Sequence, residues 1–219
     1  MKYVISSVLY VLILSSCGQQ NSNGKYFEGR IEYKISYIAY DNKVTEGMLA
    51  ERNGTKMIYS FKDGNYMKEY YTREGDLIQK RIYNRADNQM YMITNDTVYT
   101  YSPARSSFKL TSIKQGQDDV AFDRVCHHYY MELTDSITHN KMKYEYYFDP
   151  TLKINPIWYA KYTEGDWNKV MDKVKCIAVK YTNETSVFKQ IHTASKVEIE
   201  RFDLSDFIID PTLPKKHLN

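Results

Sequence analysis

Apolar and polar residues alternate one by one along most of this chain, and this period of two constrains its fold more than any other feature. The alternating apolar residues begin with Ile31, Tyr33, Ile35 and Tyr37 and continue with Met57, Tyr59 and Phe61. Such a period places one face of a strand in a core and the other in water. The sequence also holds 22 Tyr and 8 Phe against only 9 Gly and 5 Pro, a composition that suits pleated, half-buried surfaces.

Turn chemistry separates the alternating runs. Further strands are predicted at 66–71, 77–83, 89–93 and 98–101, and the intervening turns carry Asn53-Gly54, Asp63-Gly64, Glu74-Gly75-Asp76 and Asn95-Asp96. Asn-Gly and Asp-Gly between alternating runs are strong hairpin signals, because both residue types tolerate positive φ. The first half of the chain is therefore predicted to be an antiparallel meander.

The second half continues in strands. We expect strands at 108–113, 124–133, 142–148, 175–181 and 187–202, with a loop at 114–119 and with Asp149-Pro150 ending the hairpin of the middle pair. No internal repeat and no second domain boundary is visible. The predicted fold class is mainly β, with a single domain over residues 27–211 and a C-terminal tail at 212–219.

One segment departs from the period of two. After Asp166, a predicted N-cap, Trp167, Val170, Met171 and Val174 recur at spacings of three and four, which indicates a short amphipathic helix with its apolar stripe on the sheet. Aromatic residues gather beside it at Trp158, Tyr159 and Tyr162. They fit either core packing between helix and sheet, which is the commoner case, or a lid over an apolar cavity.

The N-terminus carries an export signal. Lys2 precedes an apolar run from Tyr3 to Leu14, too short to span a bilayer, and Leu14-Ser15-Ser16-Cys17 follows it. This motif resembles a bacterial lipobox, which implies removal of residues 1–16 and acylation of Cys17. Residues 18–24 contain no charge and no apolar side chain, so residues 17–26 are predicted to be the lipidated end and a flexible tether.

Two cysteines, Cys126 and Cys176, remain after acylation. An exported compartment permits disulfides, and both residues lie on the more polar face of their predicted strands. We expect the two residues to lie on neighbouring strands or segments, so that a bridge can form. Two separate buried thiols are the alternative.

The remaining sequence features argue against a metal site, a known catalytic motif and binding of nucleic acid. His127 and His128 are adjacent and point to opposite faces of a strand, and no metal-ligand spacing occurs, so no metal site and no cofactor are expected. No nucleophile elbow and no glycine-rich phosphate loop is present, which favours a protein that is not an enzyme. The net charge is +3 with interspersed signs, so nucleic acid is not an expected partner.

The order of these elements resembles the small lipoproteins of the Bacteroidota, which are similar in outline to the lipoprotein carriers LolA and LolB. The lipobox, the opening strand FEGRIEYKISY, the Cys126-His-His-Tyr-Tyr strand and the closing segment TASKVEIERFDLSDFIIDP carry this resemblance. It implies a strongly curved antiparallel sheet, an unclosed barrel, whose concave side is covered by a helix and holds a lipid or another apolar ligand. The candidates that would line that side are Tyr33, Tyr37, Tyr59, Phe61 and Trp167.

The resemblance also bears on location. Gly18 is not the acidic residue linked to inner-membrane retention, and residues 18–24 lack the acidic signal for surface export. We therefore expect an outer-membrane lipoprotein that faces the periplasm, held by its acyl chains. Three function classes stay open: a binding module for a lipid, a structural or assembly component that binds an envelope protein, and an enzyme without a recognisable motif.

Replacing Cys17 by Ser removes the thiol that would be acylated. We expect the variant to leave the membrane fraction, because anchoring requires more than one acyl chain and the variant would carry none. Fractionation and intact-mass measurement of both forms test this. Equal membrane retention, with masses that differ only by the substitution, would contradict the anchor.

Overall fold

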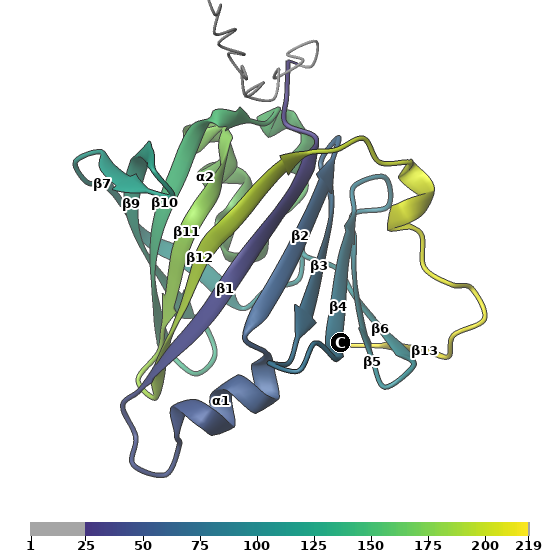
Figure 1. Cartoon of the computed structure of the whole chain (residues 1–219), viewed down its shortest axis with the longest axis horizontal. Coiled ribbons are helices and arrows are strands. Elements are labelled where there is room, and N and C mark those ends of the chain that lie inside the picture. The colour runs from purple at the N-terminus through teal and green to yellow at the C-terminus, as the bar shows by residue number, and fades with distance from the viewer. Residues whose placement is uncertain (1–24, 219) are drawn as a thin grey trace, which may run out of the picture.

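A computed structural model describes residues 25–218, so the predicted signal peptide, Cys17 and most of the predicted tether lie outside the described residues. The chain is mainly β, as predicted (Figure 1). Its strands are β1 (Gly29–Ala39), β2 (Lys56–Lys62), β3 (Asn65–Tyr71), β4 (Leu77–Asn84), β5 (Gln89–Thr94), β6 (Thr97–Tyr101), β7 (Phe108–Gln115), β8 (Asp119–Ala121), β9 (Arg124–Asp135), β10 (Lys141–Lys153), β11 (Cys176–Glu184), β12 (Phe188–Ile199) and β13 (Lys215–His217). Its helical segments are α1 (Glu46–Asn53), α2 (Trp167–Val174) and the 3-10 turns η1 (Pro156–Tyr159), η2 (Glu164–Asp166) and η3 (Leu204–Phe207).

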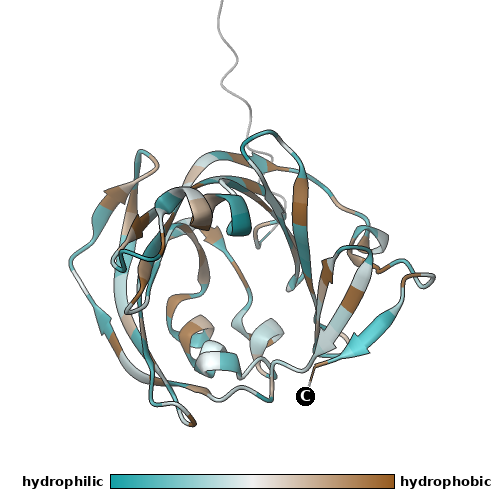
Figure 2. Ribbon diagram, turned by 90° about the horizontal axis from the view of Figure 1, so that it is seen from below, coloured by the Kyte–Doolittle hydropathy of each residue, from teal (hydrophilic) through white to brown (hydrophobic). Residues whose placement is uncertain are grey.

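The strands form one strongly curved sheet that does not close. Their order is β13-β6-β5-β4-β3-β2-β1-β12-β11-β10-β9-β7, with β8 paired separately to β9. Figure 2 shows the sheet curling around an interior that helical segments partly occupy. The predicted curved antiparallel sheet is confirmed, with one difference: β13 pairs with β6 in parallel.

Several predicted turns have the expected backbone. Asp63 and Gly64 have φ of 49° and 83°, and Asn95 and Asp96 have φ of 48° and 57°. Positive φ at both central residues is the requirement of the type I′ turn, whose twist matches that of the flanking strands. The hairpins β2–β3 and β5–β6 follow from this chemistry.

Asn53-Gly54 has a different role from the predicted hairpin turn. It ends α1, a helix that begins where the Thr45 side chain accepts a hydrogen bond from Met48 N. Gly54 has φ of 87° and donates its N–H to Ala50 O, as a helix-ending glycine does. The prediction of a hairpin turn at Asn53-Gly54 is therefore wrong, because the glycine ends a helix that the sequence did not predict.

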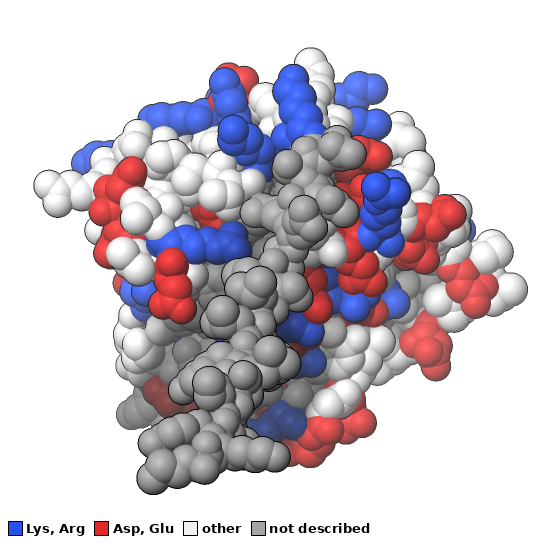
Figure 3. Space-filling view, turned by 45° about the horizontal axis from the view of Figure 1, so that its top comes forward, with Lys and Arg blue, Asp and Glu red and all other residues white. Residues whose placement is uncertain are grey.

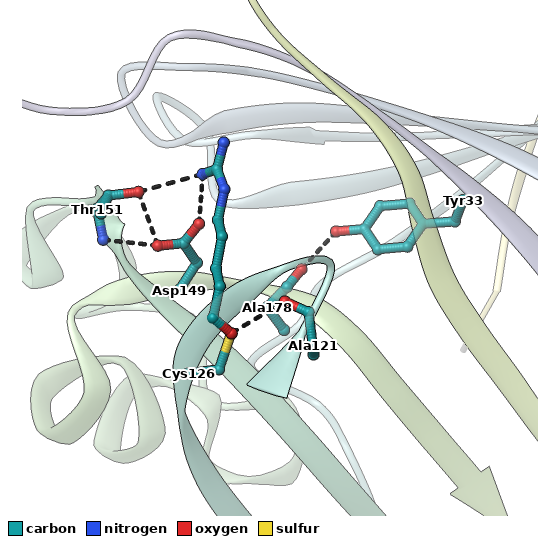
Figure 4. Close-up of polar contacts among 7 residues, drawn as sticks. Tyr33, Ala121, Cys126, Asp149, Thr151 and Ala178 are labelled. Atoms are coloured by element: carbon teal, nitrogen blue, oxygen red, sulfur yellow. Dashed lines mark hydrogen bonds and ion pairs between the residues drawn. The ribbon is translucent and has the colours of Figure 1, made fainter. Parts of the chain in front are cut away.

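Asp149-Pro150 does not end its strand. β10 runs to Lys153, and its register with β11 shifts between Asp149 and Lys153, which marks an irregular stretch. Asp149 is fully buried, and it accepts hydrogen bonds from the Arg124 guanidinium at 2.5 Å and from the Thr151 N–H and hydroxyl at 2.8 and 2.7 Å (Figure 4). These hydrogen bonds replace the ones that the Asp149 carboxylate would make with water if it were exposed.

The two faces of the sheet bury different cores. The main core lies on the concave side and includes Ile31, Tyr33 and Phe148. A small second core lies on the convex side, where Phe202 and Phe207 of the C-terminal segment cover Met67 and Ile82, together with their neighbours. The residues after β12 therefore pack on the outside of β3 and β4.

Cys126 and Cys176 do not lie on neighbouring strands, so the prediction of adjacent strands is wrong. Cys126 is the third residue of β9 and Cys176 is the first of β11, and β10 lies between these two strands. Both thiols are free and buried.

Both predicted ends of the domain are corrected. Residues 215–217 of the predicted tail form β13 on the edge of β6, although their side chains are exposed. At the other end, the Tyr26 ring, which was assigned to the tether, meets the Trp158 ring edge-on at 5.1 Å. The folded part is therefore longer than residues 27–211 at both ends.

Replacing Arg124 by Gln leaves Asp149 buried with Thr151 as its remaining side-chain partner. We expect a loss of about 2 kcal/mol in the free energy of unfolding, because a buried carboxylate loses its charge-assisted donor. Urea denaturation measures the loss. The control, Lys141→Gln, breaks an exposed pair with Glu132 and should change stability much less. Equal effects of the two substitutions would contradict the role of Arg124.

Candidate functional site

The segment between β10 and β11, residues 154–175, covers the concave face. Its two ends are held together, since Ile154 N donates to Lys175 O at 2.9 Å. It contains η1, η2 and α2, and α2 buries Val170, Met171 and Val174 as its predicted stripe requires. We call residues 154–175 the covering segment.

Asp166 occupies the N-cap position of α2, as predicted, but its side chain does not cap the helix. It has a left-handed backbone with φ of 56°, and its side chain makes no capping hydrogen bond. Its carboxylate instead accepts from the Leu110 N–H at 3.0 Å and pairs with Lys169 at 2.9 Å. The residue therefore joins the covering segment to β7.

A cavity of about 330 Å³ lies between the covering segment and the sheet. Its lining is predominantly aromatic and aliphatic. Tyr33, Tyr59 and Trp167, which were predicted to line the concave side, are part of it, and so are Val170 and Met171 of α2. The volume falls at the lower end of the range for small-molecule sites.

Tyr37 and Phe61, the other two predicted lining residues, lie outside the cavity wall. The Tyr37 hydroxyl donates to Gly54 O at 2.8 Å and accepts from Gln190 at 3.1 Å, so it fixes the end of α1. Phe61 is fully buried, and its ring packs against those of Phe27 and Trp158. Both residues face the concave side but fill core.

A chain of hydroxyl groups ties the covering segment to the sheet. The Tyr66 and Tyr162 hydroxyls lie 3.0 Å apart, and Tyr162 donates to Glu164 Oε2 at 3.1 Å. Tyr66 comes from β3, whereas Tyr162 and Glu164 come from the covering segment. This chain holds a carboxylate in the lining of a predominantly apolar cavity.

Two cations face the same interior. Lys68 lines the cavity, and its ammonium lies over the rings of Tyr59 and Tyr66 at 5.8 and 5.3 Å. Arg81 is directly opposite Lys68 in the β3–β4 ladder and lies over the Tyr70 ring at 5.5 Å. Neither forms an ion pair with a carboxylate within residues 25–218.

The charges of this group perturb one another. Burial and the positive charge of Arg81 lower the pKa of Lys68 to about 8, and Glu164 partly opposes this shift. Burial raises the pKa of Glu164, against the Tyr162 hydrogen bond and the two cations. Perturbed titratable groups in an apolar cavity are typical of functional sites.

His192 adds an unpaired polar atom nearby. Its ring stacks on that of Tyr181, with centroids 4.2 Å apart, and its Nδ1 is buried without a hydrogen-bond partner. Burial, followed by the charges of Lys68 and Arg81, lowers the pKa of His192 to about 3. The imidazole is therefore neutral at neutral pH.

The sequence contained a signal for Lys68 and Arg81 that alternation alone does not emphasise. Lys68 lies two residues from both Tyr66 and Tyr70, and Arg81 lies two residues before Tyr83. Residues two apart share a face, so these cations belong to the aromatic face rather than to the wet one. Glu164 lies in a turn and carries no such signal.

The two free thiols lie in environments that disfavour the thiolate. Burial and the nearby Asp149 raise the pKa of Cys126 to about 11, and the same causes, with Cys126, raise that of Cys176 to about 12. Thiols that stay protonated are weak nucleophiles and weak metal ligands. Within residues 25–218 no group of three or more His, Cys, Asp or Glu is placed to hold a metal ion.

The outer surface carries mixed charge. In Figure 3, Lys and Arg side chains lie among Asp and Glu over the visible face. None of the helices in the described part of the chain has the length and apolar character that a membrane span requires. No protein-family model and no curated protein matches the chain.

The pKa of Lys68 tests the geometry of the interior. Glu164→Gln removes a negative charge and should lower this pKa below about 8, whereas Arg81→Gln removes a positive charge and should raise it toward the ordinary 10.5. The ¹³C shift of reductively methylated Lys68, followed against pH, measures both. Shifts of the opposite sign, or none, would show that the three groups do not share one interior.

Proposed function

We propose that this protein is a lipid-anchored outer-membrane lipoprotein of the periplasm that binds a lipid or another apolar ligand on the concave side of its sheet. The cavity between the sheet and the covering segment carries this proposal. Its lining combines many aromatic and methionine side chains with a few polar groups, which is the usual composition of a small-molecule site. No catalytic step is part of the proposal.

The lining suits a flexible apolar chain. Met57, Met131, Met142 and Met171 all contribute to it. Methionine adapts its shape to irregular ligands, and burial of apolar area contributes about 25 cal/mol per Å². An acyl chain that leaves water for this cavity would gain most of its binding free energy in this way.

The predicted anchor supplies proximity to such ligands. Residues 17–24 would connect an acylated Cys17 to Lys25, and Tyr26 then packs on Trp158 of the covering segment. The covered end of the sheet is therefore the end at which the tether leaves the folded part. A ligand taken from the membrane would meet the covering segment first.

A second candidate is a structural or assembly component that binds an envelope protein. Two exposed apolar side chains, Val120 and Val125, which are opposite one another in the β8–β9 ladder, favour it. Exposed apolar side chains that lie together can form part of a protein–protein contact. In this case the cavity would stay empty of lipid in the purified protein, which native mass spectrometry would show.

A test of ligand binding requires a control position that neither lines the cavity nor holds the fold together, and Lys62 of β2 does not meet this requirement. Its ammonium pairs with Glu28 at 2.9 Å and also donates to Phe202 O, so it holds the C-terminal segment. Two methionines offer a better comparison. Met142 lines the cavity, whereas Met48 is exposed on α1.

Met142→Gln places an amide in the cavity wall at nearly constant volume. We expect the affinity for N-phenyl-1-naphthylamine, a neutral apolar dye, to fall roughly fivefold, because part of the apolar contact is lost. Met48→Gln should leave the affinity unchanged. Dye fluorescence, measured on the full chain carrying Cys17→Ser, reports both. Absence of dye uptake by the folded protein would contradict lipid binding and favour the structural role.

A further inference from the structure

The interior contains an electrostatic imbalance that the apolar cavity alone does not explain. Lys68 and Arg81 occupy directly opposite positions on β3 and β4. Their Cβ atoms are therefore about 5 Å apart, and like charges in this position destabilise a sheet. Along the same two strands, Lys80 is opposite Glu69 on the other face and pairs with it at 2.9 Å.

The single negative charge of Glu164 does not neutralise the two cations. Its carboxylate accepts a hydrogen bond from Tyr162 and makes no ion pair with either cation within 4.0 Å. With Lys68, Arg81 and Glu164 all charged, the interior holds one excess positive charge. A single anion between the two cations would neutralise it.

The surroundings of the two cations leave room for such a group. Lys68 belongs to the cavity wall. Arg81 is an exposed residue outside that wall, and its Nε donates to Gln79 Oε1 at 2.6 Å. The cation–π contacts with Tyr59, Tyr66 and Tyr70 hold both head groups against aromatic rings. His192 Nδ1, buried and unpaired, gives this interior a further polar atom without a partner.

We propose that the ligand is a single-chain amphiphile with an anionic head, whose acyl chain fills the aromatic cavity while the head binds between Lys68 and Arg81. This inference rests on the proposed function and adds the chemical class of the ligand. The anion can be the carboxylate of a free fatty acid or the phosphate of a lipid head group, since both accept charge-assisted hydrogen bonds from ammonium and guanidinium groups.

Three twelve-carbon probes separate the head from the chain. Laurate, dodecyl phosphate and dodecanol compete with N-phenyl-1-naphthylamine for the full chain carrying Cys17→Ser. We expect at least one of the two anions to displace the dye at roughly tenfold lower concentration than dodecanol, because hydrogen bonds to charged groups add to the same apolar contact. A preference for laurate identifies a fatty acid, and a preference for dodecyl phosphate identifies a phosphate head group.

Substitution of the two cations tests whether they cause the preference for an anionic head. Lys68→Gln and Arg81→Gln should each reduce the advantage of the anion over dodecanol, measured as the ratio of the two displacing concentrations in the same variant. Lys34→Gln, which removes an exposed cation from the outer face of β1, should keep the advantage.

Two results would overturn the inference. Equal displacement by dodecanol and both anions would show that the head is not recognised, and apolar binding would still stand. An anion preference that survives in both Lys68→Gln and Arg81→Gln would place the head elsewhere. Failure of the dye to bind at all would reject the proposed function itself, and this inference with it.

Discussion

The pairing of β1 with β12 is the contact on which the rest of the structure depends. Most other ladders join strands that follow one another along the chain, whereas this one joins Gly29–Ala39 to Phe188–Ile199. Gly29 permits the close approach, since a Cβ there would lie 2.1 Å from Glu198 O. The interior is shared between the two halves that this ladder connects: Lys68 and Arg81 come from the first, and Glu164 and His192 from the second. Neither half alone would bring these groups together.

Local chemistry explains which parts of the fold were predictable. Asp63-Gly64 and Asn95-Asp96 have one stable backbone in a tight turn, and α2 has a clear helical stripe, so both were found from the sequence. Gly54 was assigned to a turn because positive φ ends a helix as readily as it closes a hairpin. β13 was missed because its three residues are polar and exposed, so they carry no apolar alternation, although His217 and Lys216 contact Thr100 and Tyr99 of β6.

The candidate site was predictable only in part, because its polar members depend on register. Alternation identified Tyr33 and Tyr59, which line the cavity, but it also selected Phe61, which fills core at the covered end. Whether a concave residue faces cavity or core depends on the covering segment, and its path across the sheet is not encoded in strand periodicity. The opposition of Lys68 to Arg81 follows from the β3–β4 register, which the intervening loop sets without a tight two-residue turn.

The open edge of the sheet has a mechanical consequence. β6 and β7 lie on opposite sides of the opening, yet they are consecutive in the chain and are joined by residues 102–107 (Figure 2). A closed barrel can increase its circumference only by breaking a ladder of hydrogen bonds. This sheet can widen when the edges at β6 and β7 move apart, with every antiparallel ladder intact. The connecting loop limits that movement to roughly 20 Å at full extension. The width of the interior is thus set by the length of one loop, and shortening that loop would restrict the size of what the sheet can enclose.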